Sequence, residues 1–320
     1  MTVSQIFTAD QLRNRLVDEI LAEHGVPASV ERVMRAVPRD AFLPGIELEN
    51  AYTDQAMTIK DNPGKPLPLS CASVPSVVAM MLGQLDARVG DSVLEIGAGT
   101  GYNAALLAEL VDHGQVTTVD IDSDVALHAR TTPNATGYEH VTVIERDGLL
   151  GAAKSAPYDK IIATVGVWDI PTTWWEQLKD GGRLVLPPRW RGQTRSVALT
   201  RRGGELVSEG MELCGFVPII GQNGERTSPL DADDTIRVHY DQDQHVDTDA
   251  LAAIPQGTFR PPSESEERNR SMGSGCEPRP AMTACAGWKS PRRPWNKNWS
   301  AGPPLPAAAP SWSRATPWPT

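Results

Sequence analysis

The sequence predicts an α/β fold, in which helices cover both faces of a doubly wound, mostly parallel seven-stranded sheet. Three observations predict it. From residue 92 onward, short apolar runs alternate with helical segments. The first of these runs are almost continuously apolar, which is typical of parallel strands that are covered on both faces. The first run also ends in a glycine-rich turn that leads straight into a helical segment, as in Rossmann-like folds.

The N-terminal part of the chain is expected to form a helical cap. Thr8 and Gln11 have the spacing of a capping box, and apolar residues then follow at helical intervals. We expect helices at residues 9–23, 29–36, 75–85, 102–111, 123–130 and 171–179, and strands at 92–96, 116–121, 141–145, 160–165, 183–187, 195–200 and 206–213. Residues 53–72 are rich in proline, so we expect them to be irregular.

Composition divides the chain into four segments. We expect a helical cap with a substrate loop at 1–85, a cofactor-binding core at 86–221, an acidic extension at 222–258 and a tail at 259–320. The tail holds 12 of the 27 prolines and 5 of the 9 tryptophans but no valine or isoleucine. Such a composition does not build a packed core, so we interpret the tail as disordered or as out-of-frame sequence.

Acidic residues alternate along the extension, at Asp241, Asp243, Asp247 and Asp249. This spacing is similar to a calcium loop, but the glycine and the final glutamate that such a loop needs are missing. We therefore expect a solvated acidic segment and no metal site.

Charge and hydropathy exclude several classes of partner. The formal net charge is -10, whereas nucleic-acid-binding proteins usually carry a basic face. No run approaches the roughly 20 apolar residues of a membrane span. The four cysteines are scattered and form no C-x-x-C pair, which suits a reduced cytoplasm. We expect a cytoplasmic protein with neither a nucleic-acid nor a membrane partner.

The strongest motif is VLEIGAGTGYNAALLAEL, residues 93–110. Glu95 ends an apolar strand, and Gly97, Gly99 and Gly101 then form a turn that opens into a helix. Glycine lets the backbone bend sharply and approach a ligand closely, and a helix N-terminus offers free N–H groups. An acid beside the turn would repel a pyrophosphate but suits the ammonium group of a methionine moiety. The alternative is an ordinary tight turn between a strand and a helix.

Two further acids follow predicted strands. Asp120 lies about 20 residues beyond the glycines, where an acid accepts hydrogen bonds from both ribose hydroxyls. Asp147 and Gly148 follow the next strand, where Asp147 would accept from an adenine amino group and Gly148 would give clearance. Asp147 alternatively marks a simple turn, and the acids just after Asp120 are interpreted as helix caps.

At this point the chain resembles the protein-L-isoaspartate O-methyltransferases. Five segments carry the resemblance, in this order: VPRDAFLPG (37–45), AYTDQAM (51–57), VLEIGAGTGYNAALLAEL (93–110), RDGLLGAAKSAPYDKIIATVG (146–166) and DIPTTWWEQLKDGGRLVLP (169–187). The resemblance covers roughly residues 8–215. It implies a Rossmann-like methyltransferase sheet, S-adenosylmethionine as cofactor, and methylation of isoaspartyl carboxylates in peptides or proteins.

The resemblance also assigns the substrate side of the site. Ser73 matches the serine that is functional in this family, and Ser70 lies in the same loop. Trp168, on the loop after the fourth core strand, is a candidate for substrate contact. The loop departs from the family pattern, because Ala72 replaces an isoleucine and the preceding residues are not glycine-rich. Residues 212–221 are similar to an actinobacterial subgroup that is associated with the tailoring of ribosomal peptides.

A carboxylate acceptor fits this set of residues. It is already ionised at neutral pH, so it attacks a sulfonium methyl group without a general base, and catalysis consists mostly of positioning. Ser73 would orient the carboxylate, or it would merely cap the helix that follows. Three alternatives remain open: a tailoring enzyme acting on an ordinary Asp of a precursor peptide, a small-molecule methyltransferase, and a non-catalytic cofactor-binding module with a lost C-terminal segment.

Overall fold

The computed structural model describes residues 7–64, 67–112, 114–233 and 236–253, and the predicted tail lies outside these ranges. The chain begins with α1 (Ala9–Glu23), α2 (Ala28–Ala36), the short helix η1 (Arg39–Phe42) and α3 (Leu48–Ala51). The capping box is confirmed, because Thr8 Oγ1 accepts from Gln11 N at 3.2 Å and Thr8 N donates to Gln11 Oε1 at 2.9 Å. The predicted helical cap is therefore present.

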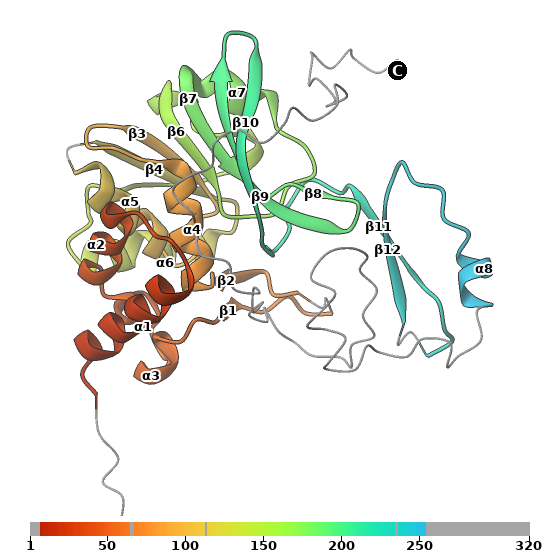
Figure 1. The fold of residues 1–320 in the computed structure, drawn as a ribbon, viewed down its shortest axis with the longest axis horizontal. Coiled ribbons are helices and arrows are strands. Elements are labelled where there is room, and N and C mark those ends of the chain that lie inside the picture. Colours follow the sequence, from red (N-terminus) through yellow and green to blue (C-terminus); the bar gives the residue numbers. More distant parts are fainter. Residues whose placement is uncertain (1–6, 65–66, 113, 234–235, 254–320) are drawn as a thin grey trace, which may run out of the picture.

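A mixed sheet follows, and it confirms the predicted fold class (Figure 1). Its strand order is β10-β9-β7-β6-β3-β4-β5, with the two-residue strand β8 paired to β9. The strands are β3 (Ser92–Ile96), β4 (Gln115–Asp120), β5 (Thr142–Glu145), β6 (Tyr158–Ala163), β7 (Leu178–Leu186), β8 (Arg189–Trp190), β9 (Gln193–Arg202) and β10 (Glu205–Leu213). The neighbours from β5 through β7 pair in parallel, whereas β9 and β10 pair antiparallel at one edge.

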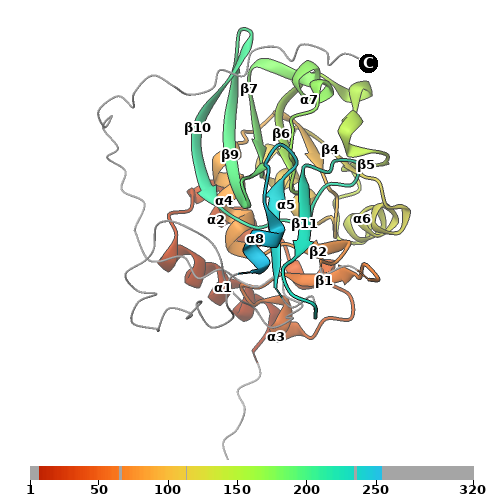
Figure 2. The same cartoon turned by 90° about the vertical axis from the view of Figure 1, so that its right-hand side faces the viewer.

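Alternate residues of the strands serve two separate cores. Val93 packs with α1, α2, α4 (Pro75–Leu85) and α5 (Tyr102–Val111), while Leu94 and Ile96 face the other side and pack with α7 (Thr172–Gln177). This alternation follows from the two-residue period of a strand. The helix α6 (Ser123–Ala135) connects β4 to β5 and lies along one flank of the sheet in Figure 2. Both faces of the sheet are thus covered, as the apolar strands predict.

Two strands lie where the sequence predicts irregular chain, so that prediction is wrong. β1 (Met57–Lys60) pairs antiparallel with β2 (Ser70–Ala72), with Met57 opposite Ala72 and Thr58 opposite Cys71. Pro63 and Pro68 lie between the two strands, and neither strand contains a proline, so both are able to pair. In both ribbon views this hairpin lies with α1 and α3 at the same end of the molecule (Figures 1 and 2).

The extension after residue 221 is also structured. β11 (Glu225–Pro229) and β12 (Arg237–Asp241) form an antiparallel pair, followed by α8 (Thr248–Ala252). The prediction of a solvated segment is wrong for Asp241, which is only 7% exposed. Its Oδ2 accepts from the backbone N–H of Arg191 at 2.8 Å, so the turn beside β8 holds the end of β12.

The predicted element boundaries need one notable correction. The helix expected at 171–179 ends at Gln177, and β7 begins directly at Leu178 rather than at residue 183. A register shift interrupts the pairing of β7 with β6, and Gly181 has a positive φ there.

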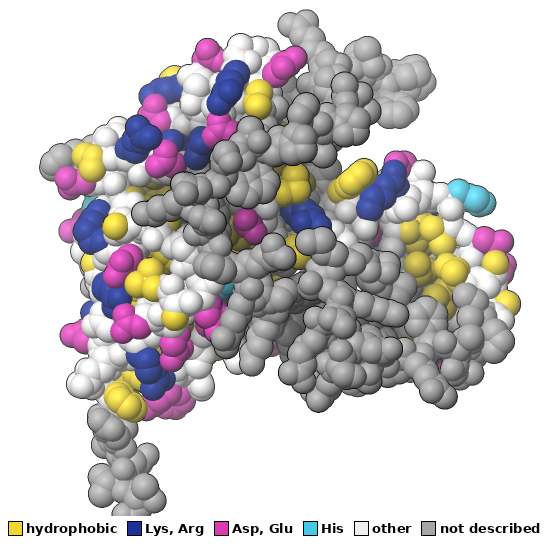
Figure 3. All heavy atoms as spheres, in the orientation of Figure 1, with side chains coloured by type: hydrophobic (Ala, Val, Ile, Leu, Met, Phe, Trp, Pro, Cys, Tyr) yellow, Lys and Arg dark blue, Asp and Glu magenta, His cyan; other side chains and the backbone are white. Residues whose placement is uncertain are grey.

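Within the described ranges, no helix is both long and apolar enough to cross a lipid bilayer. On the face shown in Figure 3, acidic and basic side chains are interspersed rather than gathered by sign.

Candidate active site

A pocket lies at the carboxyl ends of β3, β4 and β6, and Gly97 and Gly99 of the glycine turn line it, whereas Gly101 does not. Gly97, Gly99 and Gly101 all have positive φ angles, of 97°, 53° and 82°. A Cβ atom on Gly97 would lie 2.8 Å from Thr164 Oγ1, whereas one on Gly99 would meet only the Cys71 carbonyl oxygen, at 3.9 Å. The side chains of Thr164 and Val165 therefore pack tightly against the turn at Gly97, whereas the turn is open toward the pocket at Gly99.

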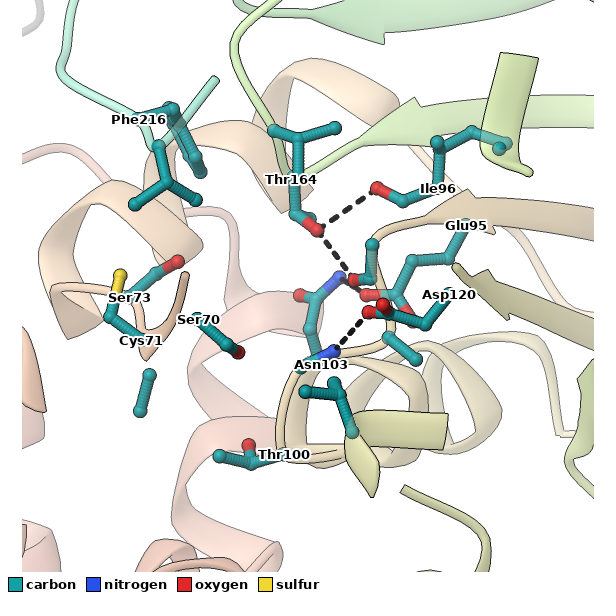
Figure 4. A pocket seen from close by; sticks show the side chains of 18 of the residues that line it. Ser70, Cys71, Ser73, Glu95, Ile96, Thr100, Asn103, Asp120, Thr164 and Phe216 are labelled. Carbon is teal, nitrogen blue, oxygen red and sulfur yellow. Dashed lines mark hydrogen bonds between the residues drawn. The ribbon is translucent and has the colours of Figure 1, made fainter. Parts of the chain in front are cut away.

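Glu95 is fully buried at the end of β3 and lines the pocket. Asn103 Nδ2, from the first turn of α5, donates to Glu95 Oε1 at 2.7 Å (Figure 4). Glu95 Oε2 has no hydrogen-bond partner among the described residues. Burial raises the pKa of Glu95 to about 7, although the hydrogen bond from Asn103 opposes the shift. A buried carboxylate with an unused oxygen is suited to a cationic ligand.

Asp120 ends β4 on the next strand of the sheet. Its Oδ2 accepts from Gly99 N at 3.3 Å and its Oδ1 accepts from Asp122 N at 3.1 Å. Burial raises the pKa of Asp120, and these backbone hydrogen bonds oppose the shift. The interpretation of Asp122 as a helix cap is confirmed, because its Oδ1 accepts from Asp124 N and Val125 N, both at 3.1 Å.

Gly148 lines the pocket, but its neighbour Asp147 is not among the lining residues. Asp147 Oδ1 accepts from Leu149 N at 2.9 Å and so closes the local turn. A Cβ on Gly148 would lie 2.7 Å from Ile96 Cγ2, which leaves no room for a side chain. The sequence-predicted pair is therefore placed so that Gly148 faces the pocket while Asp147 stabilises the turn beside it.

Ser70, Cys71 and Ser73 approach the pocket from the side opposite Glu95 (Figure 4). The alternative role of Ser73 as a helix cap is wrong, because Val74 occupies the N-cap of α4 and no side chain caps it there. The first turn of α4 is instead held by Asp54, whose Oδ1 accepts from Ser76 N at 2.8 Å. No hydrogen bond of the Ser73 hydroxyl is present within the described chain, so this group is available to a ligand.

Trp168 is not brought to the pocket. Its backbone N–H donates to Gln222 Oε1 at 2.8 Å, and a Cβ on Gly224 would lie 2.1 Å from Trp168 Cδ1. The indole ring thus packs on the start of the extension, and only a glycine fits against it. The loop after β6 does reach the site, as expected, but through Thr164 and Val165.

Several pocket residues were not singled out by the sequence. Asn103 follows Glu95 by eight positions, and the spacing that brings them together depends on the glycine turn.

The segment 216–220 crosses the pocket after β10, where Gly166 N donates to Val217 O at 2.7 Å and Ile219 N donates to Gly166 O at 2.8 Å. Its apolar run, FVPII, is the sequence signal that marks it. Arg39, from the helical cap, also lines the pocket.

The residues present fit S-adenosylmethionine. The pocket offers an orphaned buried carboxylate oxygen at Glu95, an acid at a strand end at Asp120, and a glycine turn that is open at Gly99. The free oxygen of Glu95 suits an ammonium group, and Asp120 suits the hydroxyls of a ribose. The opening at Gly99 lets a ligand chain approach the backbone closely. Across the described residues, no group of three or more histidine, cysteine, aspartate or glutamate side chains is arranged to hold a metal ion.

Comparison with known proteins agrees with this geometry. Residues 11–224 match the family model of protein-L-isoaspartate(D-aspartate) O-methyltransferase. The protein-L-isoaspartate O-methyltransferase of Methanococcus aeolicus is 38% identical over 196 residues, covering 61% of this chain and 87% of that protein. Protein-L-isoaspartate O-methyltransferase 2 of Archaeoglobus fulgidus is 36% identical over 226 residues, covering 69% of this chain and 99% of that protein.

Solved structures show the same fold. A protein-L-isoaspartate O-methyltransferase structure superimposes with a TM-score of 0.60 at 30% identity, over 65% of this chain and 66% of that one. A putative member from Plasmodium falciparum, solved with S-adenosyl-L-homocysteine, has a TM-score of 0.56 at 16% identity, over 66% of this chain and 99% of that one. Because the family match spans more than half of its length, the chain belongs to the protein-L-isoaspartate(D-aspartate) O-methyltransferase family.

Proposed function

We propose that this protein transfers a methyl group from S-adenosylmethionine to the free carboxylate of an L-isoaspartyl residue in a peptide or protein. One observation carries the proposal: a single pocket is lined by Glu95 and Asp120 on one side and by Ser73 on the other. Membership of the family supports the same activity. The relatives named above are isoaspartate enzymes, which does not favour the peptide-tailoring or the non-catalytic alternative.

Three groups of the chain would hold the cofactor. Glu95 Oε2 would accept from the ammonium of the methionine moiety, and Asp120 would accept from the ribose hydroxyls with lone pairs that Gly99 N and Asp122 N leave free. Gly148 would give the adenine room, because no side chain stands there. When bound, S-adenosylmethionine supplies an electrophilic methyl group on a sulfonium.

The acceptor carboxylate needs orientation rather than activation. Its ordinary pKa lies near 4, so it is ionised at neutral pH. A carboxylate oxygen forms a bond to the methyl carbon as the carbon–sulfur bond breaks, and the electron pair of that bond stays on sulfur. The Ser73 hydroxyl would donate to the other carboxylate oxygen and hold the attack in line. Alignment of this kind contributes up to about 7–11 kcal/mol in favourable cases.

The cellular setting is inferred from the sequence. The scattered cysteines favour a reducing compartment, and we infer a cytoplasmic enzyme whose partners are peptides and proteins rather than nucleic acid or membrane.

Labelled S-adenosylmethionine tests the proposed activity directly. The protein is incubated with three peptides that differ only in one residue, which is isoaspartate, aspartate or asparagine. We expect label in the isoaspartyl peptide alone. Label only in the aspartyl peptide would favour a tailoring enzyme, and label in none of them, together with intact binding of S-adenosylhomocysteine, would favour a non-catalytic module.

A further inference from the structure

Arg39 is a buried cation that lines the pocket and joins three parts of the chain. Its side chain belongs to η1 and the residue is only 2% exposed. Arg39 Nε donates to Ala51 O at 3.1 Å, and Nη2 donates to Ser73 O at 3.0 Å. Its guanidinium carbon lies 5.2 Å from the centroid of the Tyr102 ring. The residue therefore connects α3, the Ser73 loop and the first residue of α5.

None of these partners neutralises the charge of Arg39. Two are carbonyl oxygens and one is an aromatic face, and no carboxylate among the described residues lies within ion-pair distance of the guanidinium. The Asp54 carboxylate acts on it only at longer range, and that group already accepts from Ser76 N. Burial lowers the pKa of Arg39, but a guanidinium stays protonated in proteins.

Arg189 and Arg191 contrast with Arg39, because each pairs with a carboxylate. Arg189 pairs with Glu225, and Arg191 pairs with Asp243 at 3.0 Å. Buried charges are normally paired with an opposite charge, because the low-dielectric interior penalises an isolated ion. An uncompensated cation at the wall of a pocket therefore favours an anionic ligand there.

We propose that Arg39 is the residue that selects a carboxylate, rather than a neutral amide, as the methyl acceptor. This inference rests on the proposed function. The Ser73 hydroxyl can donate to a carboxylate or to an amide oxygen and carries no charge, so it selects between the two less strongly than a cation does. A guanidinium distinguishes them by charge, because it attracts an ionised carboxylate more strongly than a neutral amide. Through Ser73 O the same side chain also fixes the loop that presents the Ser73 hydroxyl.

The inference is tested by binding, so that it does not depend on turnover. Two peptides are titrated into the full-length protein loaded with S-adenosylhomocysteine. One carries isoaspartate with its free α-carboxylate, and the other carries the α-carboxamide in its place. The wild-type protein is expected to bind the carboxylate peptide about 10- to 100-fold more tightly, the range of one charged hydrogen bond. Equal affinities in the wild-type protein would overturn the inference.

Two variants identify Arg39 as the source of this preference. Arg39→Gln should bring the ratio of the two affinities close to one, and Arg39→Lys should keep an intermediate ratio because it retains the charge but not the fork of donors. Arg88→Gln is the matched control, because Arg88 is 75% exposed in its side chain and pairs with Asp86. An unchanged ratio in either Arg39 variant that binds S-adenosylhomocysteine normally would overturn the inference.

The outcomes separate this inference from the proposed function. A purely structural role of Arg39 would weaken S-adenosylhomocysteine binding or lower the melting temperature without changing the affinity ratio, and so would contradict the inference. A wild-type protein that prefers the carboxylate peptide but transfers no methyl group to it would contradict the proposed function and leave the inference standing. If Arg39→Gln does not fold, the inference is decided by the ratio of the affinities for the carboxylate and carboxamide peptides, measured in Arg39→Lys and in the wild-type protein.

Discussion

Lys60 Nζ donates to both carboxylate oxygens of Asp122, at 2.7 and 2.8 Å. Lys60 ends β1, whose partner strand β2 begins with Ser70, and Asp122 follows Asp120 by two residues. Asp124 Oδ2 accepts from the same ammonium group at 2.7 Å. The contact therefore joins the hairpin that leads to the substrate loop with the edge of the sheet that would hold the cofactor ribose.

Lys60→Gln removes this connection. We expect the KM for an isoaspartyl peptide to rise about 3- to 10-fold, while affinity for S-adenosylhomocysteine changes less than threefold. Because salt screens partly exposed ion pairs, the wild-type KM should rise with ionic strength and the variant KM should respond less. Steady-state kinetics at two salt concentrations measure both effects, with Arg88→Gln as control. Identical salt responses in wild-type and Lys60→Gln proteins would show that the contact does not hold the hairpin.

Asp120→Ala is expected to weaken cofactor binding and to leave the fold intact. A hydrogen bond to a charged acceptor contributes about 1.5–3 kcal/mol, so the loss of one or more should lower affinity at least 10-fold. Calorimetric titration with S-adenosylhomocysteine measures this. Asp18→Ala, an acid whose side chain is 67% exposed on the surface of α1, is the control. Equal affinities for Asp120→Ala and wild type would reject the ribose assignment.

Glu95→Gln should change how stability depends on pH. The pKa of Glu95 is raised from 4.5 to about 7 in the folded protein. Folding therefore favours the protonated carboxyl group of Glu95 over the ionised one. Its contribution to the free energy of unfolding is complete below pH 4.5 and is lost as the pH rises through 7. Without ligand, Glu95→Gln should be more stable than wild type at pH 8, by up to about 3 kcal/mol, and should lose this advantage toward pH 4.5.

The same group should release a proton when the cofactor binds, because its ammonium favours the ionised carboxylate. Titrations of S-adenosylhomocysteine at pH 6.5, in buffers of different ionisation enthalpy, count that proton. A group with a pKa of about 7 is roughly three quarters protonated at pH 6.5, so we expect a release of roughly three quarters of a proton for the wild-type protein and a much smaller one for Glu95→Gln. The same proton release in both proteins would contradict the assignment of the ammonium to Glu95.

Ser73→Ala should lower turnover far more than cofactor affinity. The Ser73 hydroxyl has no partner within the described chain and lines the pocket, so its role is expected to be with the acceptor. We expect a fall of about 10- to 100-fold in kcat/KM and less than a threefold change in affinity for S-adenosylhomocysteine. Ser76→Ala, in the first turn of the helix that follows Ser73, is the matched control. If Ser73→Ala and Ser76→Ala turn over alike, Ser73 does not orient the acceptor.

Local patterns explain why much of the fold was predictable from the sequence. The capping box at Thr8, the apolar run 92–96 and the glycine turn before Tyr102 each depend on residues a few positions apart. Glu95 and Asp120 were predictable for the same reason, since each lies within the last two residues of a strand whose period and termination are visible in the sequence. The position of these acids at one edge then follows from parallel pairing.

Contacts between distant residues explain what was missed. The β1–β2 pairing joins residues on either side of a proline-rich loop, which hides it from local rules. Arg39 becomes part of the site only through Ala51, Ser73 and Tyr102, which are spread over the first third of the chain. Trp168 follows the expected strand, but Gly224 offers it a close packing surface, and no sequence period indicates that contact.

The central claim, methylation of a backbone-linked isoaspartyl carboxylate, is tested most directly by following the mass of one peptide over time. The ester should not accumulate, because the adjacent backbone nitrogen attacks it and expels methanol. We predict an early gain of one methyl group, then a species one water lighter than the substrate, and finally the original mass as a mixture of aspartyl and isoaspartyl peptides. Proline after the target residue removes the attacking N–H, so in that peptide the ester should persist. A stable ester on the ordinary peptide, or a methyl group on anything other than the carboxylate, would contradict the account.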